Sequence, residues 1–216
     1  MLNTISLRGI LMDDMTTTVS VGGGKTYHGT VAVQRLSGTV DYLPIVIDGA
    51  KFPNLDPFFL TGNRVTISGE IRTYTRNDQE VGHRHKVCVF VQSIYKAPDG
   101  VRDDQLLALE GALCKDPVYR VTPNGREICE LMVACNVGAK ASYIPVIVWG
   151  FSARKMAGAK VGDLVEISGR FQSRKYEKKL DFTGESGEPV RVWRTAYEVS
   201  AKSCRVIGMQ RRLKAE

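Results

Sequence analysis

The sequence repeats itself with a period of about 100 residues, and this repeat limits the chain to a small number of folds. Three blocks recur in the same order: Leu7–Gly9 as Leu109–Gly111, Tyr42–Ile47 as Tyr143–Val148, and Gly62–Gly69 as Gly162–Gly169. Matched blocks in one order imply an internal duplication. The period is too long for a solenoid of stacked repeats and fits two small domains. With 216 residues and a Pro- and Gly-containing junction at Lys96–Gly100, we expect domains at residues 1–100 and 101–216.

Each half contains five short β-rich runs and one plausible helix. We expect strands at residues 3–12, 26–34, 41–48, 64–76 and 85–94, and at residues 105–113, 126–135, 142–149, 163–176 and 190–206. A short helix or helical turn should lie between the third and fourth strands, at Asn54–Leu60 in the first half, where Pro53 and Pro57 interrupt it, and at Phe151–Ala157 in the second. This element order predicts an all-β chain of two tandem oligonucleotide/oligosaccharide-binding (OB) folds, each a five-stranded barrel.

Two glycine-containing stretches fall where this fold requires hairpin turns. They are Gly22–Lys25 in the first half and Thr122–Gly125 in the second. Glycine and asparagine tolerate positive φ angles, which tight turns demand. We interpret neither stretch as a phosphate-binding loop.

Aromatic side chains share one face of a strand in the second half. If residues 142–149 form a strand, Tyr143 and Trp149 point to one side, and the aliphatic set Ile144, Val146 and Val148 points to the other. The aliphatic face suits a core. Trp149 as a core residue remains the alternative, because tryptophan is usually largely buried. Its parity with Tyr143 favours a surface on which a base could stack.

A second strand offers a similar face. In residues 163–176, the outward set should be Arg170, Gln172, Arg174 and Tyr176, with Lys175 beside them and Phe171 turned toward the core. Aromatic rings interleaved with cations suit single-stranded nucleic acid, because unstacked bases need π-faces and phosphates need positive charge. The arginines could also be ordinary solvated edge charges. Trp193, on the returning strand, could be a further platform or pack against the barrel.

The positive charge is concentrated in the second half. The net charge is +7, and residues 1–100 carry 10 Lys and Arg against 9 Asp and Glu, whereas residues 101–216 carry 20 against 14. A basic domain is typical of nucleic-acid binding, although a solvated surface is the alternative. No apolar run approaches the roughly 18 residues of a membrane span, and no secretory signal precedes the first strand, so we expect a cytoplasmic protein without membrane contact.

The residues needed for metal binding or catalysis are not grouped. The five cysteines form no CxxC pair, which argues against a disulfide framework and a zinc ribbon. His83 and His85 share a strand face, but Cys88 has the opposite parity. The sequence contains no nucleophile elbow, Walker loop or HExxH helix. We therefore expect no metal, no cofactor and no catalysis, with an enzyme using an unrecognised site as the remaining alternative.

Five blocks of the second half recur, in this order, in one known family. They are Leu109–Gly111, Lys115–Pro117 with Thr122–Gly125, Tyr143–Gly150, Gly162–Gly169 and Phe171–Tyr176. Through them the second half resembles the bacterial single-stranded DNA-binding proteins, here in a tandem form with two OB-folds in one chain. The resemblance implies that Tyr143, Trp149 and Tyr176 stack on bases and that the adjoining basic residues contact phosphates. DNA rather than RNA rests on this resemblance alone, since stacking does not distinguish them.

The first half resembles the family more faintly. It keeps Tyr42, but Asp48 stands where the second half has Trp149, and Glu70 where it has Arg170. We therefore expect the second half to supply most of the affinity. The complete set of expected DNA-binding residues is Tyr143, Trp149, Arg170, Gln172, Arg174, Lys175, Tyr176 and Trp193, with Tyr42, Arg72 and Tyr74 in the first half.

The resemblance also bears on assembly and partners. Family members combine four barrels, so two barrels per chain imply a homodimer. Their acidic C-terminal tail, which recruits replication and repair enzymes, has no counterpart in the basic ending Gln210–Glu216. Replication or repair partners should therefore bind elsewhere, and the protein should act at the nucleoid in replication, recombination or repair. A primosome-type or phage accessory protein, whose barrels mainly form a protein interface, is the alternative.

Overall fold

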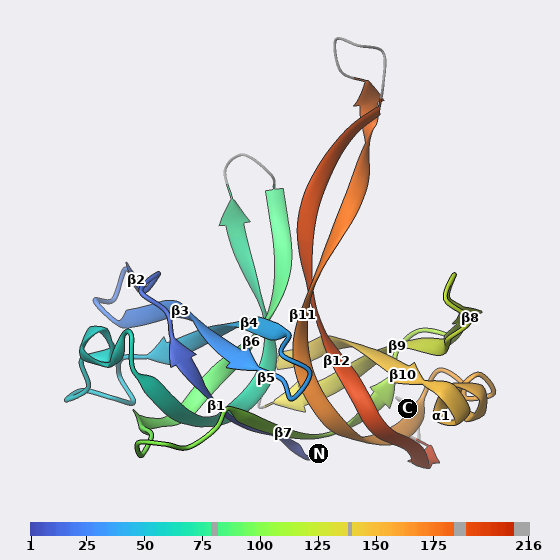
Figure 1. Ribbon diagram of the computed structural model, residues 1–216, viewed down its shortest axis with the longest axis horizontal. Helices are drawn as coiled ribbons and strands as arrows, with labels where there is room; N and C mark the ends of the chain where they lie inside the picture. Colours follow the sequence, from blue (N-terminus) through green and yellow to red (C-terminus); the bar gives the residue numbers. More distant parts are fainter. Residues whose placement is uncertain (79–81, 138–139, 184–188, 210–216) are drawn as a thin grey trace, which may run out of the picture.

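The computed structural model describes residues 1–78, 82–137, 140–183 and 189–209, which form two β-barrels with one long hairpin rising from each (Figure 1). The first half contains β1 (Asn3–Leu11), β2 (Thr16–Val19), β3 (Lys25–Gln34), β4 (Val40–Asp48), the 3₁₀ helix η1 (Pro57–Leu60), β5 (Arg64–Asp78) and β6 (Gly82–Lys96). The second contains β7 (Asp104–Leu113), β8 (Val118–Val121), β9 (Glu127–Val137), β10 (Lys140–Trp149), α1 (Gly150–Met156), β11 (Asp163–Thr183) and β12 (Pro189–Met209).

Each half closes into a five-stranded barrel, which confirms the predicted OB-fold. In the first half the neighbouring strands are β3, β4, β6, β5 and β1, and pairing of Ile10 with Ala32 joins β1 back to β3. In the second, the order β9, β10, β12, β11 and β7 is closed by pairing of Ala112 with Ala134. The strand pairs β4–β6 and β10–β12 are parallel, and the other pairs in each barrel are antiparallel.

The short helices lie where the sequence places them. Pro57 is at the start of η1, where its missing N–H costs nothing, and the Asp56 carboxylate accepts a hydrogen bond from the Phe58 amide at 3.0 Å. In the second barrel α1 buries Ala153 and Met156 against the core. Gly23 and Gly125 have φ angles of 79° and 73°, as the expected turns require. The strands β2 and β8 were not predicted. All their residues are exposed, so neither strand has a buried face that would require alternating apolar and polar residues.

The repeated glycines at the end of the third block have a steric role. At Gly69 and Gly169 the long strand is bulged against its partner, and the backbones approach closely. A Cβ atom would lie 2.2 Å from the Phe90 carbonyl oxygen at Gly69 and 2.2 Å from the Ser200 carbonyl oxygen at Gly169. Only glycine fits, which explains why both halves keep it.

The two barrels share one continuous sheet, because β1 and β7 pair as antiparallel neighbours. The register is symmetric under the repeat. Ile5 pairs with its own counterpart Leu107, Asn3 pairs with Leu109, and Leu7 pairs with Gln105. The barrels are thus related by a pseudo-twofold axis through the centre of this strand pair. Their buried residues form one core cluster that extends across both halves.

The segment between the barrels is held against the first. The Asp103 carboxylate accepts hydrogen bonds from the Gln34 amide at 2.9 Å and from Arg64 Nε at 2.8 Å, and the Ala97 amide donates to the Arg64 carbonyl at 2.8 Å. The domain boundary near residue 100 stays a prediction.

Among the described residues, no helix has the length and apolar character needed to cross a membrane.

Two long hairpins extend beyond the barrels on the same side of the molecule (Figure 1). In the hairpin β5–β6 the pairing continues to Asp78 and Gly82, and in β11–β12 it continues to Thr183 and Pro189. Both continue beyond the predicted strands, into residues that are mostly polar in the sequence and therefore gave no strand signal. These hairpins form the walls of the candidate site.

Candidate nucleic-acid interface

A cleft of about 1030 Å³ lies between the two hairpins and the body of the second barrel. We call it the hairpin groove. Its lining includes Thr73 and Lys86 of the first half, and Lys115, Tyr143, Tyr176, Trp193 and Arg194 of the second. Both halves therefore contribute to one surface.

Three of the predicted aromatic residues meet in the hairpin groove. Tyr143 projects from β10 with 54% of its surface exposed, while the next residue, Ile144, is fully buried, so the predicted alternation is correct. Tyr176 comes from β11 and Trp193 from β12, with Trp193 72% exposed. Tyr176 is partly exposed, and all three rings along the open groove provide π-faces on which unstacked bases can lie.

Cations accompany these rings. Lys86, Lys115 and Arg194 line the groove, and Lys175 joins Trp193 and Arg194 around a smaller adjoining hollow. In the part of the chain whose side chains the structure describes, none of these four cations pairs with a carboxylate. The groove therefore places positive charge beside the aromatic rings, and phosphate is the anion that a chain of stacked bases brings.

Three of these cations were missed by sequence reasoning. Lys115 belongs to the Lys115–Pro117 block, and Arg194 directly follows Trp193, so both carried a signal. Lys86 is paired with Tyr74 across the hairpin β5–β6. Its approach to the second half depends on tertiary structure and has no local signature.

Trp149 lies at the surface but outside the groove lining. It is 37% exposed, whereas Val148 beside it is 1% exposed, so Trp149 is not a core residue. Its indole N–H donates to the Ser200 hydroxyl at 3.1 Å, which fixes the ring at the end of β10. Its contact with bases stays a prediction.

Gln172 departs from the predicted outward face. Its parity on β11 is as expected, but the first barrel covers the base of this strand, and Gln172 is only 5% exposed. Its amide donates to Glu198 Oε1 at 2.9 Å, and its carbonyl oxygen accepts from Arg35 at 3.4 Å and Arg170 at 3.3 Å. Gln172 therefore lies in the contact between the two barrels. The prediction that its side chain is exposed is wrong.

Arg170 and Arg174 lie on either side of Gln172. Arg170 is half-buried, and burial together with the nearby Arg35 guanidinium lowers its pKa. Arg174 is more exposed, pairs with Glu198 at 3.2 Å, and places its guanidinium 5.7 Å from the Tyr176 ring centre. The pair with Glu198 holds Arg174 beside the groove and also neutralises part of its charge.

The predicted residues of the first half are dispersed. Tyr42 is exposed on β4, and Tyr74 lies with its ring 5.7 Å from that of His28. Arg72 pairs with Glu70 at 2.6 Å and lies over the Phe90 ring. None of these three lines the hairpin groove as the structure describes it, and Thr73 and Lys86 do so instead.

No metal-binding cluster of His, Cys, Asp or Glu occurs among the described residues. The side chains of His83 and His85 lie outside them. Cys88 is fully buried, and burial raises the pKa of its thiol to about 12.

Comparison with known proteins finds similarity in the second half. Residues 105–205 match the model of the Single-strand binding protein family. The match covers slightly less than half of the chain. The matched segment extends from the second residue of β7 into β12 and contains every residue that the second half contributes to the hairpin groove.

Curated relatives agree over the same region. The chain is 37% identical over 79 residues to single-stranded DNA-binding protein 2 of Clostridium acetobutylicum, covering 33% of this chain and 59% of that protein. It is 34% identical over 92 residues to the single-stranded DNA-binding protein of Bacillus cereus, covering 39% and 51%. The chain thus spans between half and three-fifths of the length of these two relatives.

One similar solved structure covers both barrels. It is the single-stranded DNA binding protein from Thermus aquaticus, in a deletion mutant, with a TM-score of 0.73 over 95% of this chain and 94% of that one. The sequence identity is 19%, so this likeness shows the fold alone. It confirms that the tandem arrangement of two OB-folds occurs in a known protein.

Proposed function

We propose that this protein binds single-stranded DNA without sequence preference and without catalysis, in replication, recombination or repair. The observation that carries the proposal is the hairpin groove, in which three aromatic rings lie among cations that pair with no carboxylate among the described side chains. Stacking accepts every base because every base has a π-face, and phosphate contacts carry no sequence information. The family that residues 105–205 match and the names of the curated relatives support the same ligand.

A titration with a labelled oligo-dT tests the proposal. The logarithm of the binding constant should fall linearly with the logarithm of salt concentration, with a slope of about −0.7 per contacted phosphate on a single strand. Unlabelled oligo-dT should compete well and duplex of the same length poorly. Oligo-rU in the same assay reports the choice between DNA and RNA. Duplex that competes as well as the single strand would reject the proposal.

The same titration addresses the alternative of a protein interface. Binding through an aliphatic surface should depend little on salt, so salt-insensitive behaviour combined with no affinity for oligo-dT would favour a primosome-type or phage accessory role. We further propose that partners from replication or repair dock on the barrels and that the protein acts at the nucleoid in the cytoplasm.

We also propose a homodimer that brings four barrels together. The support is the tandem repeat, since one chain supplies two barrels of the family fold. Analytical ultracentrifugation at micromolar protein should give twice the mass of 23.9 kDa. A monomer mass, both with and without oligo-dT, would refute this assembly.

A further inference from the structure

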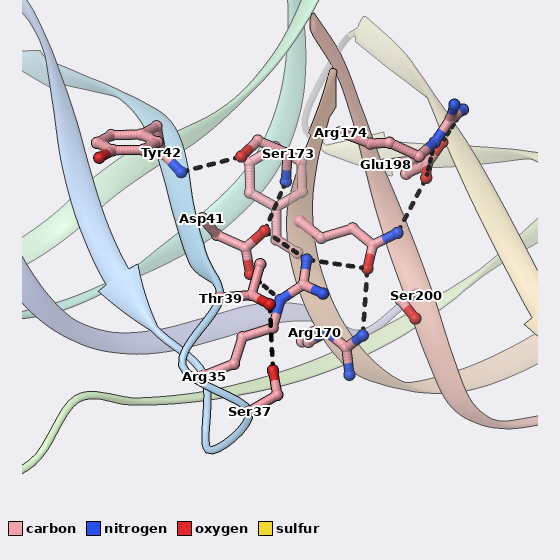
Figure 2. A network of polar contacts seen from close by, with 12 residues as sticks. Arg35, Ser37, Thr39, Asp41, Tyr42, Arg170, Ser173, Arg174, Glu198 and Ser200 are labelled. Carbon is pink, nitrogen blue, oxygen red and sulfur yellow. Dashed lines mark hydrogen bonds and ion pairs between the residues drawn. The ribbon is translucent and has the colours of Figure 1, made fainter. Parts of the chain in front are cut away.

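The hairpin β11–β12 is fixed at its base by the first barrel. Asp41 on β4 is fully buried and accepts a hydrogen bond from the Ser173 amide of β11 at 2.9 Å (Figure 2). The Ser173 hydroxyl in turn accepts from the Tyr42 amide at 2.9 Å. Arg35 holds the Asp41 carboxylate with two nitrogens, each at 2.6 Å. A carboxylate bound by both fork nitrogens of an arginine has a defined orientation.

This anchor is connected to the groove by a short chain of contacts. Arg35 donates to Gln172, Gln172 donates to Glu198 on β12, and Glu198 pairs with Arg174. Arg174 lies against the ring of Tyr176, which lines the hairpin groove. The contacts thus lead from a buried ion pair of the first barrel to a stacking residue of the second.

The other hairpin is anchored in a mirrored but weaker way. Thr73, the counterpart of Ser173, donates its amide to the hydroxyl of Ser142, the counterpart of Asp41, at 3.2 Å. Each barrel therefore holds the hairpin of the other. At this equivalent position a carboxylate of an ion pair contacts the hairpin with Tyr176 and Trp193, whereas a hydroxyl contacts the hairpin with Lys86.

Stability alone gives a weak reason for such an anchor. A buried ion pair often adds little to folding compared with apolar residues of similar size, because both charges lose their hydration. What the pair does supply is a fixed geometry between β4 and β11. The distance between the two walls of the groove depends on that geometry.

We propose that Arg35 and Asp41 are positioning residues for DNA binding: they set the hairpin β11–β12 at the spacing at which Tyr176, Trp193 and Lys86 act on one strand. The inference rests on the proposed function. It gives the first barrel a role that does not require it to contact bases, despite Asp48 and Glu70 on its surface.

The test removes the anchor in the full-length protein. Asp41→Asn is the simplest change, but it leaves Arg35 without its acidic partner and can prevent folding. The double variant Arg35→Met/Asp41→Leu leaves no unpaired buried charge. The matched control is Arg64→Met/Asp103→Leu, because Asp103 also accepts one backbone amide and one arginine in the first half, and neither residue lines the groove.

Hydrogen exchange without DNA measures the anchor itself. Amides of residues 170–177 should exchange about tenfold faster in Arg35→Met/Asp41→Leu, the change expected when a hydrogen-bonded contact of ordinary strength is lost. The control variant should leave them unchanged. Unchanged exchange in Arg35→Met/Asp41→Leu would overturn the inference, whatever the protein binds.

Oligo-dT binding measures the consequence. The double variant should bind about tenfold more weakly at a temperature where it is fully folded, because a mobile hairpin must be ordered on binding. Trp193→Ala should lower the affinity at least about threefold less in this background than in the unchanged protein. Trp193 and Asp41 lie on different barrels, and the effects of substitutions at distant sites normally add, so this coupling would be specific to the anchor. Additive losses, or an unchanged affinity, would overturn the inference. Failure of the unchanged protein to bind oligo-dT would instead overturn the proposed function, and the role in binding with it.

Discussion

Trp193 exposes a large ring beside the hairpin groove, although a side chain of this size is usually largely buried. Its exposure leaves a large π-face open to a ligand, in line with the proposed stacking of bases. Tyr143 is a similar case on β10. These exposed aromatic side chains thus differ from the buried side chains that form the core.

Trp193→Ala should weaken oligo-dT binding by about fivefold to more than a hundredfold, because stacking of a base on an aromatic ring contributes roughly 1–3 kcal/mol. Its thermal melting should hardly change, since the ring is 72% exposed. Tyr42→Ala is the matched control from the first half, because Tyr42 is also exposed but lies outside the groove, and it should cost less. Equal losses of affinity in the two variants would show that the strand does not follow the hairpin groove.

Some residues of the site could be predicted from local sequence, and others depend on tertiary structure. Alternation on β10 correctly predicts Tyr143 and Trp149 at the surface, because one local pattern decides which face is buried. The same reasoning fails for Gln172, which is covered by a barrel about 130 positions away in the sequence. Lys86 was missed for the same reason, since its place in the groove follows from how two hairpins are arranged.

At the scale of elements, the bulges of the long strands decide where each hairpin leaves its barrel. Gly69 and Gly169 permit the close backbone approach. Both glycines end the repeated blocks Gly62–Gly69 and Gly162–Gly169, so the sequence marks these positions. The length of the hairpins and the strands β2 and β8 were not predictable in this way. The residues of β2 and β8 are all exposed, and the outer residues of the hairpins are mostly polar in the sequence, so neither shows an alternating apolar pattern.

Gly169→Ala should destabilise the protein by about 1–3 kcal/mol or more, because its Cβ would lie 2.2 Å from the Ser200 carbonyl oxygen. Gly208→Ala is the control on the paired strand β12, where the nearest atom would be at 3.9 Å. That change should stay within about 1 kcal/mol. Denaturant unfolding measures both. A Gly169→Ala protein as stable as Gly208→Ala would contradict the packing of the bulge.

At the scale of the whole molecule, both barrels bury thiols that must stay protonated. Burial raises the pKa of Cys88, Cys135 and Cys204 from 9.0 to about 12. Above pH 9 the unfolded chain therefore loses protons that the folded chain retains. A group whose pKa is raised by folding contributes stability below its unfolded pKa and loses it as the pH rises.

The melting temperature should therefore fall as the pH rises from 9 to 12. Replacing Cys88, Cys135 and Cys204 by alanine should make this decline shallower, although the cavities lower the melting temperature at neutral pH. Tyrosine and lysine ionisation is common to both proteins and cancels in the comparison. A triple variant with the same slope as the unchanged protein would show that the buried thiols do not control alkaline stability.

The pseudo-twofold arrangement gives the molecule two similar barrels with unequal tasks. The second barrel supplies Tyr143, Tyr176 and Trp193, while the first supplies Lys86 and the anchor at Asp41. Duplication thus accounts for the fold, and later divergence for the asymmetry. We therefore propose that one strand of DNA lies between the two hairpins.

Photo-crosslinking tests this claim most directly. The full-length protein would be irradiated with an oligonucleotide containing 5-iododeoxyuridine, and the crosslinked residues identified by mass spectrometry. Crosslinks should concentrate at Tyr143, Tyr176 and Trp193, the aromatic residues of the hairpin groove. Crosslinks confined to exposed aromatic residues outside the groove, such as Tyr95 and Tyr119, would contradict the account.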